Sequence, residues 1–481
     1  MNTSAVEYTV TFGDRLLSFV GIFVMIGIAW LLSAERKRVD WRLVGIGVAL
    51  QLFFATFILI TPIGKPIFDV ATAAFTKVMS FTETGSRLIF GAYDQLQDSL
   101  LKTLAFGVLP TIIFFSSLMA VLYHLGVMQK IVSWMARLMQ RTMRTSGSET
   151  LSAAANIFVG QTEAPLMIRP YVATMTRSEL MVVMVGGFAT VAGGVMAVYV
   201  AFLEPHYPGI AGHLMAASVM SAPAALVIAK VLIPETEQSE TQGEAKLEVE
   251  KIDANVIDAA ARGAGEGLTL MLNVGAMLLA FVALVAMVNY LIALPSYAQH
   301  HSLLEGLWQA LIASKVDLST HASCDPSLVK WEGARACVET LAPLSEGLST
   351  PVSADQLWAT MSFERLFGYL FAPLAYLIGV PAQDVLAVGE LLGSKVVLNE
   401  FVAYQQLTEL AKAGALTERS VVISSYALCG FANFGSIAIQ IGGIGGIAPT
   451  RRADLARLGL KAMIGGTLAA LMTASVAGIL L

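Results

Sequence analysis

Charged residues are scarce in this sequence. Only 14% of its 481 residues are Asp, Glu, Lys or Arg, whereas a soluble domain usually carries about 25%. Hydrophobic residues make up 56% of the chain, and the mean hydropathy is +0.70. This balance places the chain in a lipid bilayer rather than in water. No soluble catalytic domain is visible, and the small net charge of −5 gives no sign of a nucleic-acid partner.

The N-terminal residues also do not predict a secretory signal. The first apolar run follows Glu7 and Asp14 rather than a basic region, and no small-residue cleavage site follows it. We therefore expect residues 16–33 to remain as a first spanning helix.

Long apolar segments dominate the remainder and predict an all-α polytopic membrane protein. Eight segments are long enough to span the bilayer: residues 16–33, 43–61, 104–123, 180–203, 210–233, 268–294, 421–441 and 460–481. Lys and Arg cluster after the first, third and seventh segments, at residues 35–42, 130–177 and 451–461. All three clusters are cytoplasmic if both termini face outward.

Two segments are too polar to face lipid and too apolar for solvated loops. Residues 146–175 and 384–416 are rich in Gly, Ser, Thr and Asn, and each contains a carboxylate. Irregular backbone survives at membrane depth only inside protein or beside a water-filled cavity. We interpret both as re-entrant hairpins, which enter the membrane from opposite sides.

A weak internal repeat links the hairpins to the spans that follow them. The first copy contains Gly160-Gln161-Thr162-Glu163 and Gly186-Gly187-Phe188-Ala189; the second contains Leu398-Asn399-Glu400-Phe401 and Cys429-Gly430-Phe431-Ala432-Asn433. Inverted repeats with broken helices are typical of secondary transporters, whose substrates bind near the membrane midplane. Chance similarity is the alternative, because Gly and Ala are common in membrane helices.

Glu163 and Glu400 are the most informative positions. A charge at membrane depth costs about 2.5–3.5 kcal/mol on insertion scales, so such residues usually serve a pathway. We expect both carboxylates to be buried together around a shared polar solute; the alternative is that they cap backbone amides. Asn433 and Ser436 offer donors and acceptors suited to hydroxyls, although such residues also mediate helix packing.

Three motifs resemble those of the concentrative nucleoside transporters. They are Gly160-Gln161-Thr162-Glu163-Ala164-Pro165-Leu166, Asn399-Glu400-Phe401-Val402-Ala403-Tyr404 and Cys429-Gly430-Phe431-Ala432-Asn433, in the order found in that family. The resemblance implies eight spans, two hairpins with an inverted-repeat transport core, and a homotrimer.

The resemblance also implies roles for individual residues. The nucleobase would contact Gln161, Thr162, Glu163 and Val195, and the ribose Glu400, Asn433 and Ser436, with Phe431 between the two. A sodium site would comprise the side chains of Asn156 and Thr190 and the carbonyls of Val159 and Val191. Such oxygen ligands suit a weakly bound monovalent cation.

The expected function is nucleoside uptake by cation symport, with Na⁺ favoured over H⁺, through an elevator-type mechanism in a bacterial inner membrane. No enzyme activity, other cofactor or nucleic-acid partner is expected. A different polar solute, a passive channel and an intramembrane enzyme that uses the two glutamates as acid and base are the alternatives.

The chain divides into six predicted regions. These are peripheral helices and an interfacial helix (1–100), a first repeat half (101–235), a cytoplasmic linker with an interfacial helix (236–267), a scaffold helix (268–295), a periplasmic insert (296–362) and a second half that begins with an interfacial helix (363–481).

The insert is longer than the family pattern leads us to expect, and it contains Cys324 and Cys337. A disulfide between them would contribute about 3 kcal/mol, and a periplasmic location would permit it. His300, His301 and His321 make a Zn²⁺ site conceivable, but their spacing matches no standard pattern, and we interpret them as residues of a flexible loop. Cys429 is expected to be a small buried side chain.

Overall fold

The computed structural model describes residues 8–90, 105, 106, 109–242, 253–314, 316, 318–345 and 361–481. Throughout these residues the regular elements are helices, which confirms the all-α prediction. The chain forms two compact units: unit 1 comprises Met1–Leu278 and Phe367–Leu481, and unit 2 comprises Leu279–Leu366.

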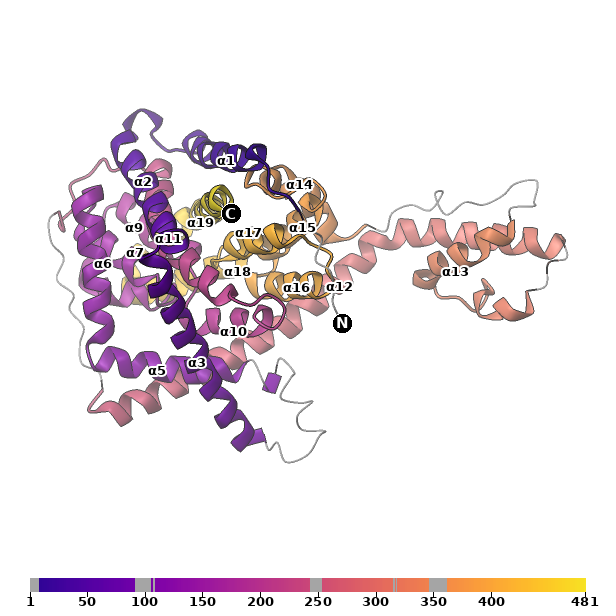
Figure 1. Ribbon diagram of the computed structural model, residues 1–481, viewed down its shortest axis with the longest axis horizontal. Coiled ribbons are helices and arrows are strands. Elements are labelled where there is room, and N and C mark those ends of the chain that lie inside the picture. Colours follow the sequence, from indigo (N-terminus) through magenta and orange to yellow (C-terminus); the bar gives the residue numbers. More distant parts are fainter. Residues whose placement is uncertain are drawn as a thin grey trace. The chain divides into compact units, whose positions relative to one another are not determined.

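The α-helices of unit 1 follow the predicted order (Figure 1). They are α1 (Phe12–Leu31), α2 (Trp41–Leu59), α3 (Gly64–Phe90), α5 (Pro110–His124), α6 (Val127–Met143), α7 (Gly147–Ala155), α8 (Arg169–Val172), α9 (Arg177–Ala189), α10 (Gly193–Leu203), α11 (Ile210–Leu232), α15 (Val385–Val397), α16 (Glu400–Lys412), α17 (Glu418–Leu428), α18 (Phe434–Ile447) and α19 (Arg452–Leu480). The helix α12 (Val256–Ala313) begins in unit 1 and ends in unit 2, and α14 (Phe363–Leu377) begins in unit 2 and ends in unit 1.

The last helix, α19, forms the centre of unit 1. It packs against α1, α2, α9, α11, α17 and α18 (Figure 1). Small residues such as Gly465, Gly466 and Ala470 on α19 are buried. Small side chains let membrane helices approach closely and gain dispersion contacts. The C-terminal helix is therefore the core against which both repeat halves pack.

Each of the eight predicted spans is helical, although the start of the third lies outside the described residues. Within the described chain, six helical segments are long and apolar enough to cross a membrane, and the bent pair α5–α6 raises the number to seven. The predicted span 421–441 is not among them, because it is broken into α17 (11 residues) and α18 (14 residues). Breaks in the fourth and seventh spans are therefore present, as expected.

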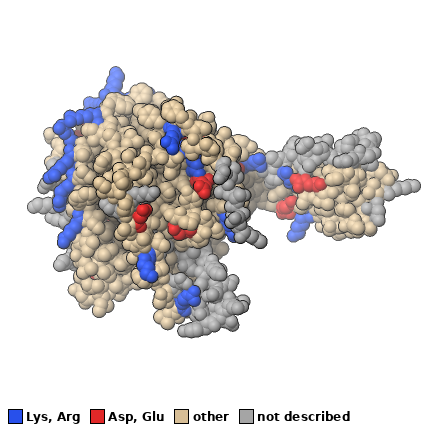
Figure 2. All heavy atoms as spheres, viewed as in Figure 1, with Lys and Arg blue, Asp and Glu red and all other residues tan. Residues whose placement is uncertain are grey.

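The basic clusters lie at one end of unit 1. The Ala34 amide beside the first cluster donates to the Leu232 carbonyl, and Arg451 of the third cluster donates to the Ala173 carbonyl between α8 and α9. Figure 2 shows Lys and Arg side chains along the edge of unit 1 that carries α6, while most of the visible surface is uncharged. This arrangement supports a common side for all three clusters.

A buried ion pair joins α7 to α11 at the same end. The Lys230 ammonium lies 2.8 Å from the Glu149 carboxylate and 3.2 Å from that of Glu235. Thr241 follows in the chain and bonds through its carbonyl to the Gly147 amide. The segment after α11 is thereby tied to the start of α7.

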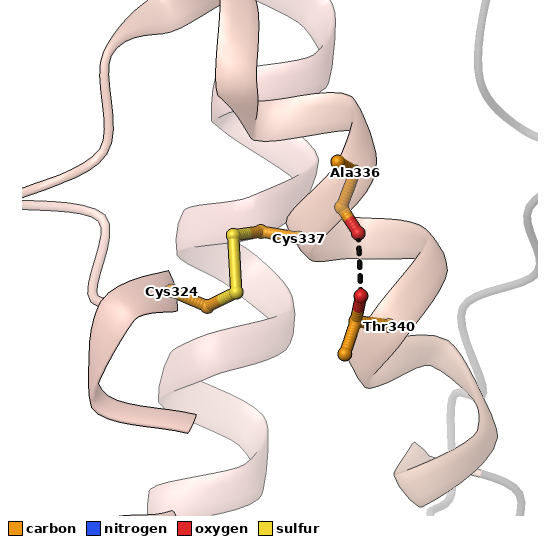
Figure 3. Close-up of a disulfide and its surroundings, with 4 residues drawn as sticks. All are labelled: Cys324, Ala336, Cys337 and Thr340. Atoms are coloured by element: carbon orange, nitrogen blue, oxygen red, sulfur yellow. Dashed lines mark hydrogen bonds between the residues drawn. A yellow bond between two sulfur atoms is a disulfide. The ribbon is translucent and has the colours of Figure 1, made fainter. Parts of the chain in front are cut away.

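Unit 2 is a small disulfide-linked lobe with its own core. Leu304, Leu307 and Leu311 from α12 pack against Val338 and Leu341 of α13 (Ala334–Leu341). Figure 3 shows a disulfide between Cys324 and Cys337, a bond that the sequence left open, and it joins the end of the 3₁₀ helix at Ser319–Cys324 to α13. The disulfide closes a short loop next to this apolar core.

Two expectations about this region are wrong. The predicted interfacial helix, scaffold helix and start of the insert form one continuous helix, α12, which runs through Pro295. Its last turns carry the leucine stripe that fills the core of unit 2, so packing extends the helix past the proline. His300 and His301 consequently lie on α12 rather than in a loop. The described residues contain no group of three His, Cys, Asp or Glu side chains that could hold a metal.

Candidate functional site

The tip of the first hairpin contacts the break in the fourth span. Asn156 is the C-cap that follows α7, and Thr190, whose backbone is extended, is the C-cap that follows α9. The Gly193 amide, at the start of α10, donates to the Phe158 carbonyl of the hairpin tip at 3.1 Å. The end of α7 and the break between α9 and α10 therefore meet at one largely buried junction.

The second hairpin is formed by α15 and α16, and it lies beside the break between α17 and α18. The Asn399 side chain caps α16 by accepting from the Val402 amide. Gly430 in the break has φ +125, a conformation that favours glycine. An added Cβ there would lie 2.5 Å from the Phe188 carbonyl oxygen. The two helix breaks therefore meet, as the repeat predicted.

Glu400 is buried at this meeting point. Its carboxylate accepts from the Tyr199 hydroxyl at 3.0 Å and from the Asn433 amide group at 2.9 Å. Stacking on Tyr404, with ring centroids 4.1 Å apart, holds the Tyr199 ring in place. Both neighbours donate, so the carboxylate serves only as an acceptor, and its remaining lone pairs are available to hydroxyl groups of a ligand.

Asn433 and Ser436 are brought together by helix capping rather than by a shared helical face. Asn433 is the N-cap of α18, and its side-chain oxygen accepts from the Ser436 amide at 2.8 Å. The Ser436 hydroxyl then accepts from the Gln161 side chain of the first hairpin at 3.2 Å. A continuous hydrogen-bonded path thus runs from Glu400 through Asn433 and Ser436 to Gln161.

The other predicted substrate contacts lie on the first hairpin, on α10 and in the break between α17 and α18. Thr162 packs on α18, because an added Cβ at Gly443 would lie 3.0 Å from its methyl carbon. Val195 on α10 is buried and Phe431 in the helix break is half-buried. Among the described residues, no hydrogen bond joins Thr162 or Glu163 to Glu400.

Glu163 differs from Glu400 in its environment. Its side chain is exposed, whereas Glu400 is only 6% exposed. Glu163 lies over Gly160, where an added Cβ would approach its Oε2 to 2.5 Å. The expectation that both carboxylates are buried together is therefore wrong for Glu163. The hairpin turn directs Glu163 to accessible space, while Tyr199 and Asn433 cover Glu400.

The predicted cation ligands form a second cluster near the first break. Asn156 is fully buried, and neither polar atom of its amide has a hydrogen-bond partner. The Thr190 hydroxyl donates to the Gly186 carbonyl at 2.8 Å, which leaves its own oxygen free to accept. An added Cβ at Gly186 would lie 3.1 Å from Asn156 Nδ2, so Asn156 and Thr190 flank the same residue.

The backbone at this cluster also fits a cation. Within the described residues, no hydrogen bond is directed to the carbonyls of Val159 or Val191. A buried polar group without a partner costs about 1–3 kcal/mol. An orphaned amide on α7's C-cap, with unbonded carbonyls on the adjoining segments, offers the oxygen ligands that suit a monovalent cation.

Two residues of the site were missed from the sequence. Tyr199 holds Glu400, and Gln440 donates to both the Gln161 side chain and the Met184 carbonyl. Gln440 lies four residues after Ser436 on α18, so helical periodicity could have revealed it. Tyr199 carried no comparable signal, because a tyrosine in a spanning helix is usually a packing residue.

Two broken helices meet at a site suited to a polar ligand that bears hydroxyl groups, and a cluster of candidate cation ligands lies near it. This arrangement is typical of secondary transporters. Family models describe the same chain. The model for the Na⁺-dependent nucleoside transporter C-terminus matches residues 213–314 and 336–478, and the N-terminal model matches residues 20–93. A nucleoside recognition (Gate) model matches residues 105–205. The chain belongs to the Na⁺-dependent nucleoside transporter family.

Similar proteins support this family assignment. The chain is 40% identical over 468 residues to a transporter of Haemophilus influenzae described as uncharacterized, covering 96% of this chain and 97% of that protein. It is 38% identical to sodium/nucleoside cotransporter 1 of Mus musculus, over 97% of this chain but 64% of that longer protein.

Solved structures match over nearly the whole chain. The structure of CNTnw in an inward-facing substrate-bound state has a TM-score of 0.77 and 39% identity, over 97% of each chain. A CNTnw double variant in an outward-facing state matches with a TM-score of 0.77 and 38% identity, over 97% of each chain. The predicted fold class and cation-coupled nucleoside transport are thereby confirmed at the level of the family.

Proposed function

We propose that this chain takes up nucleosides together with Na⁺ and that the path from Glu400 to Gln161 is the substrate site. Glu400 and Asn433 bind the ribose hydroxyls, because a carboxylate acceptor and an amide lie 2.9 Å apart in a buried position. Gln161 presents an amide to the nucleobase, and Ser436 and Gln440 hold that amide in place. The single observation that carries the proposal is this hydrogen-bonded path between the two hairpins.

The remaining site residues complete the substrate site. Thr162, Glu163 and Val195 lie on the nucleobase side, and Phe431 separates base from ribose. Glu163 is exposed in this structure, so its contact with the base depends on substrate or on another state of the transport cycle.

The coupling cation is assigned to Asn156, Thr190 and the carbonyls of Val159 and Val191. One cation that moves inward through 100 mV releases about 2.3 kcal/mol. At about 1.4 kcal/mol per tenfold change, this energy supports roughly 40- to 50-fold accumulation of nucleoside. Sodium is preferred to protons because the cluster contains oxygen ligands and no carboxylate.

Alternating access in this proposal moves both hairpins and the two broken helices together as an elevator. A homotrimer in a bacterial inner membrane remains the predicted assembly and location. Light scattering on the detergent-purified protein would test the trimer; a monomeric mass would contradict it.

The decisive experiment is uptake of labelled uridine into proteoliposomes. An inward Na⁺ gradient should drive accumulation, whereas an inward H⁺ gradient without Na⁺ should not. Glu400→Gln should weaken uptake strongly, and Glu163→Gln should weaken it as well. Parent-rate uptake by folded Glu400→Gln protein would contradict the assigned site, and gradient-independent uptake would contradict symport.

A further inference from the structure

One buried charge plays no part in the function described so far. Lys395 lies on α15 in the second hairpin and is only 1% exposed. Its ammonium donates to the Ala427 carbonyl at 2.9 Å. A charged side chain within a membrane protein is expensive to bury and usually serves a functional pathway.

The surroundings of Lys395 are negative without containing a contact ion pair. Ala427 is near the end of α17, and the carbonyls at a helix C-terminus carry partial negative charge. Glu400 begins α16, five residues further along the same hairpin, and its carboxylate accepts a hydrogen bond from Asn433 in the break that follows α17. In the described chain, no carboxylate lies within 4.0 Å of Lys395. Glu400 is therefore the acidic group whose charge this lysine compensates at a distance.

The position of Lys395 parallels that of the cation cluster. In the first hairpin, Asn156 ends α7 and lies beside the end of α9. In the second hairpin, Lys395 is in the last turn of α15 and bonds to the end of α17. Each repeat thus places a cation-binding position between its hairpin and its helix break, and in the second repeat an ammonium already stands there.

We propose that Lys395 is a positioning residue for nucleoside binding, acting as the built-in cation of the second repeat and as the counter-charge of Glu400. The proposal rests on the function above, in which Glu400 binds the nucleoside. Tyr199 and Asn433 orient the Glu400 carboxylate through hydrogen bonds. The lysine supplies the positive charge that lets this buried carboxylate remain an acceptor for substrate hydroxyls.

A double-mutant cycle tests this role, because it isolates the energy that two residues share. The variants are Lys395→Met, Glu400→Gln and the double variant, and uridine binding is measured by titration calorimetry in Na⁺. We expect Lys395→Met to weaken binding about tenfold in the parent and less than about twofold in the Glu400→Gln background. The same factor in both backgrounds, or parent-like binding by Lys395→Met, would overturn the proposal.

Two further variants separate charge from packing. Lys395→Gln keeps a donor for the Ala427 carbonyl but removes the charge, so it should behave like Lys395→Met. Lys412→Met removes an exposed charge from the other helix of the same hairpin and should bind uridine as the parent does. Parent-like binding by Lys395→Gln would show that an uncharged donor to the Ala427 carbonyl suffices and would overturn the proposal.

Thermal unfolding of the same variants without uridine gives an independent reading. Lys395→Met should lower the Tm of the parent and lower that of Glu400→Gln much less, because the second background has no buried carboxylate to compensate. Failure of Lys395→Met to fold, with recovery in the double variant, would support the same coupling; an equal loss in both backgrounds would overturn it. If Glu400→Gln bound uridine like the parent, the proposed substrate site would fail, while the Tm cycle would still decide the role of Lys395.

Discussion

Replacing Asn156 by Ala tests the proposed cation site, because the sign of its effect on stability should depend on whether Na⁺ is present. Without Na⁺, the buried Asn156 amide has no hydrogen-bond partner for either polar atom, which costs about 1–3 kcal/mol for each group. The variant removes this cost and leaves a small cavity that costs about 1 kcal/mol. We therefore expect Asn156→Ala to be at least as stable as the parent in choline chloride.

In NaCl, the parent should instead be more stable than Asn156→Ala. A ligand that binds only the folded protein stabilises it by about 2.7 kcal/mol at a concentration one hundred times its Kd. The parent should gain this energy through the Asn156 oxygen and its neighbours, and Asn156→Ala should gain little. The assay is thermal unfolding of purified protein in matched series of NaCl and choline chloride, followed by Na⁺-driven uridine uptake.

Gln51→Leu is the matched control for this experiment. Gln51 is also a fully buried amide, but it donates to the Thr473 hydroxyl on α19 at 2.9 Å. Its loss should leave the stabilisation by Na⁺ unchanged. If Asn156→Ala kept the parent's Na⁺ response in both unfolding and uptake, the assignment of the cation site would be refuted.

Three other predictions concern different parts of the molecule. Gln440→Leu removes the hydrogen bond that Gln440 donates to the Gln161 side chain. The Kd for uridine, measured by calorimetry, should rise about tenfold; an unchanged Kd would contradict a role of Gln440 in positioning Gln161. Lys230→Met leaves the buried Glu149 carboxylate, 2.8 Å away, without its partner, and should destabilise the protein by about 3–5 kcal/mol. Its Tm should fall, and recover in part with Glu149→Gln. Reducing the disulfide between Cys324 and Cys337 should cost unit 2 about 3 kcal/mol, seen as faster proteolysis of this lobe; an unchanged rate would show that its apolar core suffices.

Local properties of the chain predicted most of the fold. Apolar length, Lys and Arg position, and polar-apolar mixtures depend on the nearest residues, and they located the spans, the hairpins and the basic end. The break between α17 and α18 followed from Gly430 and its neighbours, because glycine permits the left-handed backbone found there. The continuous course of α12 through Pro295 could not be predicted, because the core of unit 2 stabilises the helix beyond the proline.

The candidate site shows the same division. The amino-acid sequence by itself predicted the side chains of the proposed substrate site: Glu400 and Asn433 stand out by polarity, and Gln161 by the motif that contains it. Only the tertiary structure decided their environments, since Tyr199 and Asn433 cover Glu400 while Glu163 stays exposed. Burial and pairing depend on segments hundreds of residues apart, and no short-range pattern contains that information.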